Sequence, residues 1–386
     1  MRLGEICVIN PKAPALDDDI NVSFVPMPKV GENGEFDPSE IKKYHEVKKG
    51  FTYFRDGDIL FAKITPCMEN GKGAIARSME NGIGFGSTEF HVLRPENNVV
   101  IGEWVYYLLN WSPFRKEAEK NMTGSAGQKR VPKSFLENFE IALPDTETQK
   151  NQVKTLQTLD ILISLRKQQL AKLDELVKAR FVELFGDPVD NPMGWATKQL
   201  QELVTDDCTI SYGIVQTGDD QEEGVPVFRP VDIVNRIPVR SELKKTTEEI
   251  SNKYKRTILK GREMLIPVRA NIADTCIVGE EFAGCNVGRG IVPIRTREDE
   301  IILEFLKYQI DSKHLNDNIK ALAKGITLIQ LNMEDLREVN LIVPPIEQQK
   351  NFVEFAKQTD KSKSAIQKSL EKLETLKGAL MQKYFG

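Results

Sequence analysis

Two short segments decide the fold of this chain, ALPDTETQK at 142–150 and IVPPIEQQK at 342–350. They superpose without a gap when the sequence is shifted against itself by 200 residues. The match continues to the end of each copy, and its identities include Pro144 and Pro344, Glu147 and Glu347, Gln149 and Gln349, Asp160 and Asp360, Leu173 and Leu373, and Phe185-Gly186 and Phe385-Gly386. A duplicated unit of this length predicts two related halves. Upstream of the matching segments the halves diverge, so we expect them to be related but specialised.

A long helix is predicted after each of the two segments. Residues 147–185 contain neither glycine nor proline and consist mostly of strong helix formers, which indicates one helix of about 38 residues and roughly 57 Å. Apolar residues recur at intervals of three and four, as in a coiled coil. We expect 146–186 and 346–386 to pair antiparallel and to bury Leu170, Leu173, Leu370 and Leu373 between them. The alternative is that each helix packs on its neighbouring domain.

The regions outside these helices, 1–145 and 187–345, read as α+β domains. Strand patterns occur at 57–64, 225–231 and 291–295, and apolar strand patterns at 139–143 and 339–343 lead into the two repeated segments. One helical stretch is expected in each region, near 104–120 and 300–319. The predicted fold class is α+β, with two globular domains joined by two long antiparallel coiled-coil helices and related by a pseudo-two-fold axis.

Length and composition set broader limits. The 386 residues exceed what one ordinary core carries, and 40% hydrophobic with 28% charged residues is typical of globular proteins. The sequence shows no apolar run long enough to cross a bilayer and no signal peptide, which predicts a soluble, unexported protein. Five cysteines without a Cys-x-x-Cys pair fit a reducing cytoplasm. A net charge of −4 argues against a histone-like protein and leaves local basic surfaces possible.

The sequence offers little support for catalysis or metal binding. His45, His91 and His314 are scattered, and position 49 is lysine where a zinc-protease helix needs histidine. Gly71-Lys72 lacks the earlier glycine of a nucleotide-binding loop, and the glycine-rich stretch 82–88 is expected to be a turn. A nucleophilic Cys276 or Cys285 with His314 as base is conceivable, but both cysteines lie in sequence typical of buried strand and turn. We expect no catalytic residue, no metal site and no cofactor.

Basic and amide side chains recur at matching places in the two domains. Arginine and glutamine read guanine and adenine edges, whereas lysine mainly contacts phosphate. Solvated surface explains any single one of them better, but recurrence in both domains favours nucleic-acid binding. The candidates in the first domain are Lys63, Lys72, Arg77, Gln128, Lys129, Arg130 and Lys133, and those in the second are Arg229, Arg262, Arg269, Arg289, Lys324, Thr327 and Gln330.

Over its whole length the chain resembles the specificity subunit of type I restriction-modification enzymes. The resemblance rests on the two segments at 142–150 and 342–350, each opening a long helix after a domain of unlike sequence, on Gly325-Ile326-Thr327, and on the stretch 195–200, which resembles the opening of a target-recognition domain. It implies target-recognition domains at 1–145 and 187–345, each reading half of a bipartite site in double-stranded DNA. It also implies that spacer helices at 146–186 and 346–386 hold the halves apart and dock two methyltransferase subunits.

The resemblance further implies a non-catalytic chain. Methylation with S-adenosylmethionine and ATP-driven translocation and cleavage belong, in that family, to modification and restriction subunits. The first copy departs from the pattern, with Pro144-Asp145 for Pro344-Pro345 and Gly124-Ser125-Ala126 for Gly325-Ile326-Thr327. Two alternatives remain: a coiled-coil adaptor that binds proteins, mildly favoured by the net charge, and an enzyme with a cysteine nucleophile. Salt-sensitive DNA binding discriminates against the adaptor. The bases recognised cannot be read from the sequence.

Overall fold

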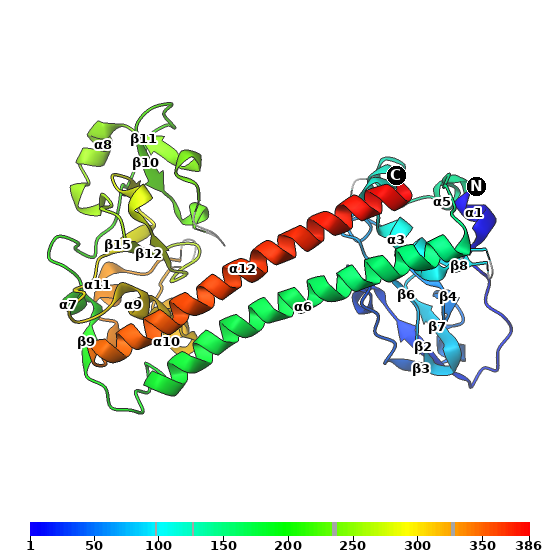
Figure 1. Ribbon diagram of the computed structural model, residues 1–386, viewed down its shortest axis with the longest axis horizontal. Helices are drawn as coiled ribbons and strands as arrows, with labels where there is room; N and C mark the ends of the chain where they lie inside the picture. The colour runs from blue at the N-terminus through cyan, green and yellow to red at the C-terminus, as the bar shows by residue number, and fades with distance from the viewer. Residues whose placement is uncertain (97–98, 126, 234–237, 326–328) are drawn as a thin grey trace. The chain divides into compact units, whose positions relative to one another are not determined.

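The computed structural model describes the chain except for residues 97–98, 126, 234–237 and 326–328. It forms two compact units, unit 1 with residues 1–167 and 368–386 and unit 2 with residues 168–367. The long helices α6 (Thr146–Phe185) and α12 (Ile346–Phe385) therefore each contribute one half to each unit (Figure 1). In the described part of the chain, none of the helices is both long enough and apolar enough to cross a membrane.

The described residues of unit 1 form two four-stranded sheets and five short α-helices besides the long ones. One sheet has the order β1-β8-β5-β6 and the other the order β3-β2-β7-β4, and only the β2–β7 pair is parallel. The strands are β1 (Cys7–Ile9), β2 (Asn21–Val25), β3 (Ile41–Lys43), β4 (Thr52–Arg55), β5 (Ile59–Ala62), β6 (Gly73–Ile75), β7 (Ile83–Gly86) and β8 (Phe90–Pro95). The helices are α1 (Leu3–Ile6), α2 (Tyr44–Val47), α3 (Gly102–Asn110), α4 (Ser112–Lys120) and α5 (Lys133–Asn138).

Unit 2 has smaller sheets, with the orders β13-β12-β15, β11-β10-β14 and β16-β9. The strands are β9 (Thr197–Gln199), β10 (Val225–Phe228), β11 (Lys244–Thr246), β12 (Glu263–Pro267), β13 (Cys276–Val278), β14 (Asn286–Val287), β15 (Ile291–Ile294) and β16 (Asn340–Ile342). The helices are α7 (Leu200–Leu203), α8 (Glu248–Asn252), α9 (Leu303–Ile310), α10 (Lys313–Ala321) and α11 (Met333–Arg337). Both units are thus α+β, as the sequence predicts.

The single helical stretch expected in each domain is wrong, because both stretches are broken into two helices. In unit 1, α3 ends at Asn110 and α4 begins at Ser112 with Pro113 in its first turn. Proline lacks the backbone N–H that would continue the preceding helix but is tolerated in a first turn. In unit 2, α9 ends at Ile310 and α10 begins at Lys313.

Two other local expectations are corrected. The stretch 82–88 contains strand β7 rather than only a turn, and its glycines allow close packing: a Cβ on Gly84 would lie 2.3 Å from the Phe54 ring, and one on Gly86 would lie 2.2 Å from the Val25 carbonyl oxygen. The pattern at 139–143 forms no strand, only an isolated bridge between Arg2 and Glu140. Its counterpart at 339–343 does form a strand, β16, because β9 supplies three residues to pair with it.

The long helices contact each other in both units, and the contacts fix their direction. In unit 1, Lys377 near the end of α12 forms an ion pair with Asp160 in the first half of α6 at 2.5 Å. In unit 2, Phe352 near the start of α12 packs edge-on against Phe181 near the end of α6, with ring centroids 5.4 Å apart. The start of one helix therefore lies beside the end of the other, which confirms the antiparallel pairing.

Each helix also packs on its domain, so the two expectations for the helices do not exclude each other. Leu156 of α6 belongs to the core of unit 1, and Phe181 and Phe352 belong to the core of unit 2. Of the four leucines expected at the helix interface, Leu370 is buried and Leu170, Leu173 and Leu373 are half-buried. Mutual contact among these four leucines, and the pseudo-two-fold axis, stay predictions.

Candidate nucleic-acid interface

A loop closed by the same backbone pairing occurs once in each unit. In unit 1, Arg130 forms antiparallel bridges with Ile64 and Thr123, and in unit 2, Gln330 forms them with Arg269 and Lys324. We call residues 123–130 and 324–330 the tip loops. The residue after each tip loop is bound to the segment that follows the central strand β5 or β12. The N–H of Val131 donates to the Lys63 carbonyl at 2.9 Å, and that of Leu331 to the Val268 carbonyl at 3.0 Å.

At the start of each central strand, the end away from the tip loop, a buried carboxylate forms an ion pair with an arginine. In unit 1, Arg94 of β8 makes a bidentate pair with the buried carboxylate of Asp58, at 2.7 and 2.8 Å. In unit 2, Arg295, which follows β15, binds the buried Glu263 at 2.9 Å and also Asp207 at 2.7 Å. The first residue of the turn before each central strand donates its N–H to the same carboxylate. These pairs fix the starts of β5 and β12, and the tip loops contact the residues that follow the ends of these two strands.

Three of the seven candidate residues in unit 1 form an ion pair with an acidic neighbour. Arg130 makes a bidentate pair with Glu89 at 2.8 and 2.9 Å, and this hydrogen bonding lowers the pKa of Glu89. Arg77 pairs with Glu103 at 2.8 Å, on the rim of a cavity of about 400 Å³, and Lys133 pairs with Glu137 at 2.8 Å.

The remaining candidates in unit 1 differ in exposure. Burial lowers the pKa of Lys63, whose charge lies near Glu89 and Arg130. Lys72 donates to the Met27 carbonyl at 3.4 Å. Gln128 and Lys129 are exposed in the tip loop, and their side chains form no hydrogen bond or ion pair with the residues that the structure describes. Unit 1 therefore brings Lys63 and Arg130 together at Glu89, next to Lys129 of the tip loop, whereas Arg77 and Lys133 pair with other carboxylates.

In unit 2, three candidates are held by carboxylates. Arg229 binds Asp232 at 2.8 and 3.0 Å, Arg262 binds Glu304 at 3.0 Å, and Lys324 binds Asp335 at 3.2 Å.

The other two candidate arginines of unit 2, Arg269 and Arg289, form no ion pair with a carboxylate of the described residues. Arg269 binds the Gln330 side-chain oxygen through Nε at 2.7 Å and also through Nη2, and the Gln330 amide nitrogen donates to the Tyr212 hydroxyl. Arg289 is exposed, and neither arginine forms an ion pair with a described residue. Thr327 lies outside the described residues. Unit 2 therefore gathers Arg269, Arg289 and Gln330 at its tip loop.

The repeated glutamine at the start of each long helix proves to be structural. Gln149 and Gln349 are fully buried. The Gln149 side-chain oxygen accepts the N–H of Ile101 at 2.9 Å, and that of Gln349 accepts the N–H of Ile302 at 3.0 Å. Both amide groups also donate to the proline carbonyl five residues earlier, at 2.9 and 2.8 Å. Each glutamine thus fixes the beginning of a long helix to the beginning of a shorter helix of the same unit, α3 in unit 1 and α9 in unit 2. The repeat pointed to this pair of residues, whereas nothing in the sequence pointed to Glu89 or Tyr212.

The structure gives no support to a cysteine nucleophile. Burial raises the pKa of Cys276 to about 11 and also raises that of Cys285, which disfavours the thiolate. The expected base, His314, is bound to Asp187 at 3.1 Å. Asp190 is the third member of this exposed group, and Asp187 also accepts the N–H groups of its own turn, so local hydrogen bonding accounts for the arrangement.

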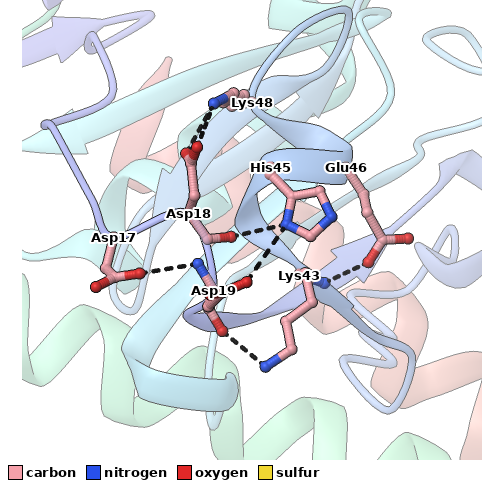
Figure 2. Close-up of polar contacts among 7 residues, drawn as sticks. All are labelled: Asp17, Asp18, Asp19, Lys43, His45, Glu46 and Lys48. Atoms are coloured by element: carbon pink, nitrogen blue, oxygen red, sulfur yellow. Dashed lines mark hydrogen bonds and ion pairs between the residues drawn. The ribbon is translucent and has the colours of Figure 1, made fainter.

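The other two histidines are likewise held by the fold. Burial lowers the pKa of His91, whose ring contacts the Val131 carbonyl at 2.8 Å. Figure 2 shows the surroundings of His45, whose Nδ1 donates to the carbonyl of Asp18 at 3.0 Å. Lys48 binds the Asp18 carboxylate at 2.7 Å, so these contacts fasten the loop before β2 to helix α2.

Comparisons with known proteins agree with this duplicated arrangement. The family model described as type I restriction modification DNA specificity domain matches residues 1–175 and 192–376. The type I restriction enzyme EcoEI specificity subunit of Escherichia coli is 45% identical over 177 residues, which cover 45% of this chain and 30% of that protein. The alignment thus spans less than a third of that relative.

Two matches cover nearly the whole chain. The putative type I restriction enzyme MjaX specificity subunit of Methanocaldococcus jannaschii is 23% identical over 382 residues, 94% of this chain and 84% of that protein. A solved structure from work on complex assembly and conformational transition of the type I R-M system aligns with a TM-score of 0.63 at 21% identity, covering 100% of this chain and 96% of that one. Since the family model covers most of the sequence in two copies, the chain belongs to the type I restriction modification DNA specificity domain family.

Proposed function

We propose that the chain is the DNA-recognition subunit of a type I restriction-modification complex. Residues 1–145 and 187–345 each read one half of a bipartite site in double-stranded DNA. The helices 146–186 and 346–386 set the spacer between the halves and dock two methyltransferase subunits, and restriction subunits join through that complex. The chain itself is non-catalytic, needs no cofactor and works in the cytoplasm.

The observation that carries this proposal is the pair of tip loops. Equivalent backbone bridges place Arg130 and Gln330 at matching points, each beside the end of a central strand whose start carries a buried carboxylate–arginine pair. The scaffold is the same but the side chains differ, as expected for two modules that read different sequences. Lys129 and Arg289 are exposed beside them and suit phosphate contacts.

The coiled-coil adaptor is the second reading, and the net charge of −4 was the argument for it. That charge is a sum over the whole chain, however, and does not describe the tip loops, where Lys129 is exposed and forms no ion pair with a described residue. The specificity subunits that the chain resembles favour DNA over protein as the ligand.

The test is to delete the gene in its source strain and to sequence methylated adenines across the genome. We expect methylation to disappear from one motif made of two short halves with a fixed spacer, and to return when the gene is restored. Unchanged methylation, together with purified chain that shows no salt-sensitive DNA binding, would support the adaptor instead.

A further inference from the structure

The two tip loops differ in how they hold an arginine. In unit 1 Arg130 is bound to a carboxylate, whereas in unit 2 Arg269 is bound to a neutral amide. The backbone defines the equivalence: the N–H of Lys63 donates to the Glu89 carbonyl at 2.9 Å, and that of Val268 donates to the Gly290 carbonyl at 2.8 Å. Glu89 of unit 1 therefore corresponds to Gly290 of unit 2. By the same pairing Arg130 corresponds to Gln330, and Ile64 corresponds to Arg269.

In unit 1 this arrangement is a closed ion pair. Glu89 occupies the Nε and Nη2 edge of Arg130, and the Gln128 carbonyl accepts from Nη1 at 3.0 Å. Each nitrogen of the guanidinium group thus already has a partner within the protein.

In unit 2 the corresponding carboxylate is missing. Gly290 leaves no side chain there, and a Cβ at this position would lie 2.5 Å from the Pro230 ring and 3.5 Å from the Arg269 Cβ. Arg269 is held instead by the neutral Gln330, whose side-chain oxygen accepts hydrogen bonds from Nε and Nη2 of Arg269. The opposite edge of the guanidinium group, formed by Nη1 and the second N–H of Nη2, has no acceptor among the described residues, and the residue is partly exposed.

A second side chain fixes the orientation of Gln330. Its amide nitrogen donates to the hydroxyl of Tyr212, and Tyr212 packs on the core of unit 2. The order Tyr212, Gln330, Arg269 is a chain of hydrogen bonds that begins at the core and ends on a free pair of N–H donors. Such a fork matches two acceptors side by side, as in the O6 and N7 atoms of guanine or two oxygens of a phosphate.

We propose that Arg269 reads the O6 and N7 edge of a guanine in the half-site of unit 2, with Gln330 and Tyr212 as positioning residues. This inference rests on the proposed function and names one element of its specificity. Guanine is favoured over phosphate because two neighbouring side chains fix the direction of the fork, which a point contact to phosphate does not need. Arg289, exposed one residue before Gly290, is the phosphate contact beside it.

The test is a selection from a random double-stranded DNA library with the full-length chain, purified with and without its methyltransferase subunit. Wild type, Arg269→Ala, Arg269→Lys, Tyr212→Phe and Arg289→Ala are compared after their melting temperatures confirm folding. We expect Arg269→Ala and Arg269→Lys to lose about 5- to 150-fold discrimination at one guanine of one half-site, with all other positions kept. Tyr212→Phe should lose about 2- to 12-fold discrimination at the same guanine. It should not change the salt slope, by which we mean the steepness with which the logarithm of the affinity falls with the logarithm of the salt concentration.

Arg289→Ala is the matched control, because it should weaken binding to all sequences alike and lower the salt slope by about 0.9. A second arm replaces the guanine by 7-deazaguanine, which lacks the N7 acceptor. The wild type should lose affinity for this DNA, whereas Arg269→Ala should not distinguish it from normal DNA.

The outcomes separate this inference from the proposed function. If the wild type selects no motif, the proposed function fails. If the wild type selects a bipartite motif and Arg269→Ala selects the same one with uniformly weaker binding, Arg269 contacts phosphate and the inference is overturned. Retained binding by Arg269→Lys together with equal affinity for 7-deazaguanine DNA would overturn it as well.

Discussion

Units 1 and 2 are alike in what holds them together and unlike in what they present. Both fasten the start of a long helix with a buried glutamine, and both place an arginine–carboxylate pair at the start of the central strand. At the tip itself, unit 1 has the closed pair Arg130–Glu89 and unit 2 has Arg269 on a neutral glutamine. The two halves thus share the same backbone scaffold but carry different side chains at the tip loops.

The largest effect is expected at the buried ion pairs. Asp58→Ala leaves Arg94 without its carboxylate and should lower the free energy of unfolding by about 3–5 kcal/mol. Glu263→Ala should cost less, because Arg295 keeps Asp207 at 2.7 Å. Urea unfolding measures both variants. Asp207→Ala is the control, since half of that side chain is exposed, and it should cost about 1 kcal/mol or less. Equal losses of unfolding free energy in Asp58→Ala and Glu263→Ala would show that Asp207 does not compensate for the loss of Glu263.

The next effect concerns the feature that the units share. Gln149→Ala and Gln349→Ala each leave a buried N–H and buried carbonyls without partners, so each should cost about 1–3 kcal/mol. The two losses should be similar, because the hydrogen bonds are equivalent. Gln358→Ala, on the exposed side of α12, should change urea unfolding little. A loss confined to one of the two buried glutamines would break the structural equivalence of the units.

A smaller effect should follow from removing the carboxylate beside Arg130 and, separately, adding one beside Arg269. Glu89→Gln releases Arg130 and should raise the salt slope of DNA binding by up to about 0.9, the contribution of one phosphate contact. Gln330→Glu adds a negative charge beside Arg269 and should lower the slope, but by less than one phosphate contact, because Arg269 is assigned to a base edge. Fluorescence anisotropy between 50 and 200 mM salt measures both slopes. Changes of the same sign in the two variants would contradict the comparison.

The smallest effect is the pH dependence that Glu89 of unit 1 gives to the free energy of unfolding. Hydrogen bonds from Arg130 hold the pKa of Glu89 below its ordinary value of about 4.3. A carboxyl group whose pKa is lower in the folded state stabilises that state above the ordinary pKa, and this contribution is lost as the pH falls through the folded pKa. An NMR titration should show the pKa of Glu89 rising in Arg130→Ala. Gly290, which corresponds to Glu89 in unit 2, has no side chain that could titrate, so this contribution has no equivalent at that position. An unchanged Glu89 pKa would show that the ion pair does not form in solution.

Much of the fold could be predicted from the sequence because the repeat and helical periodicity are local signals. The shift of 200 residues and the absence of glycine and proline located α6 and α12. The break between α3 and α4 was visible in Pro113 but was outweighed by the apolar pattern. Strand β7 was missed because its glycines resemble a turn, and only the packing of Phe54 explains them.

The candidate site could be predicted only in outline. Arg269, Gln330 and Arg130 were identified by residue type and matched position. Their partners Tyr212 and Glu89 lie 118 and 41 residues away from Gln330 and Arg130. Such pairings arise from tertiary folding and leave no local pattern. For the same reason the sequence could not separate Arg269 and Arg289 from an arginine such as Arg262, which is held by a carboxylate distant in the sequence.

The central claim is that each domain reads one half of the DNA site independently. The most direct measurement replaces residues 1–145 by the first recognition domain of another family member and determines the motif selected from a random DNA library. The account predicts that one half of the motif changes to that of the donor, while the other half is kept. A motif that stays the same, or one in which both halves change, would contradict the claim.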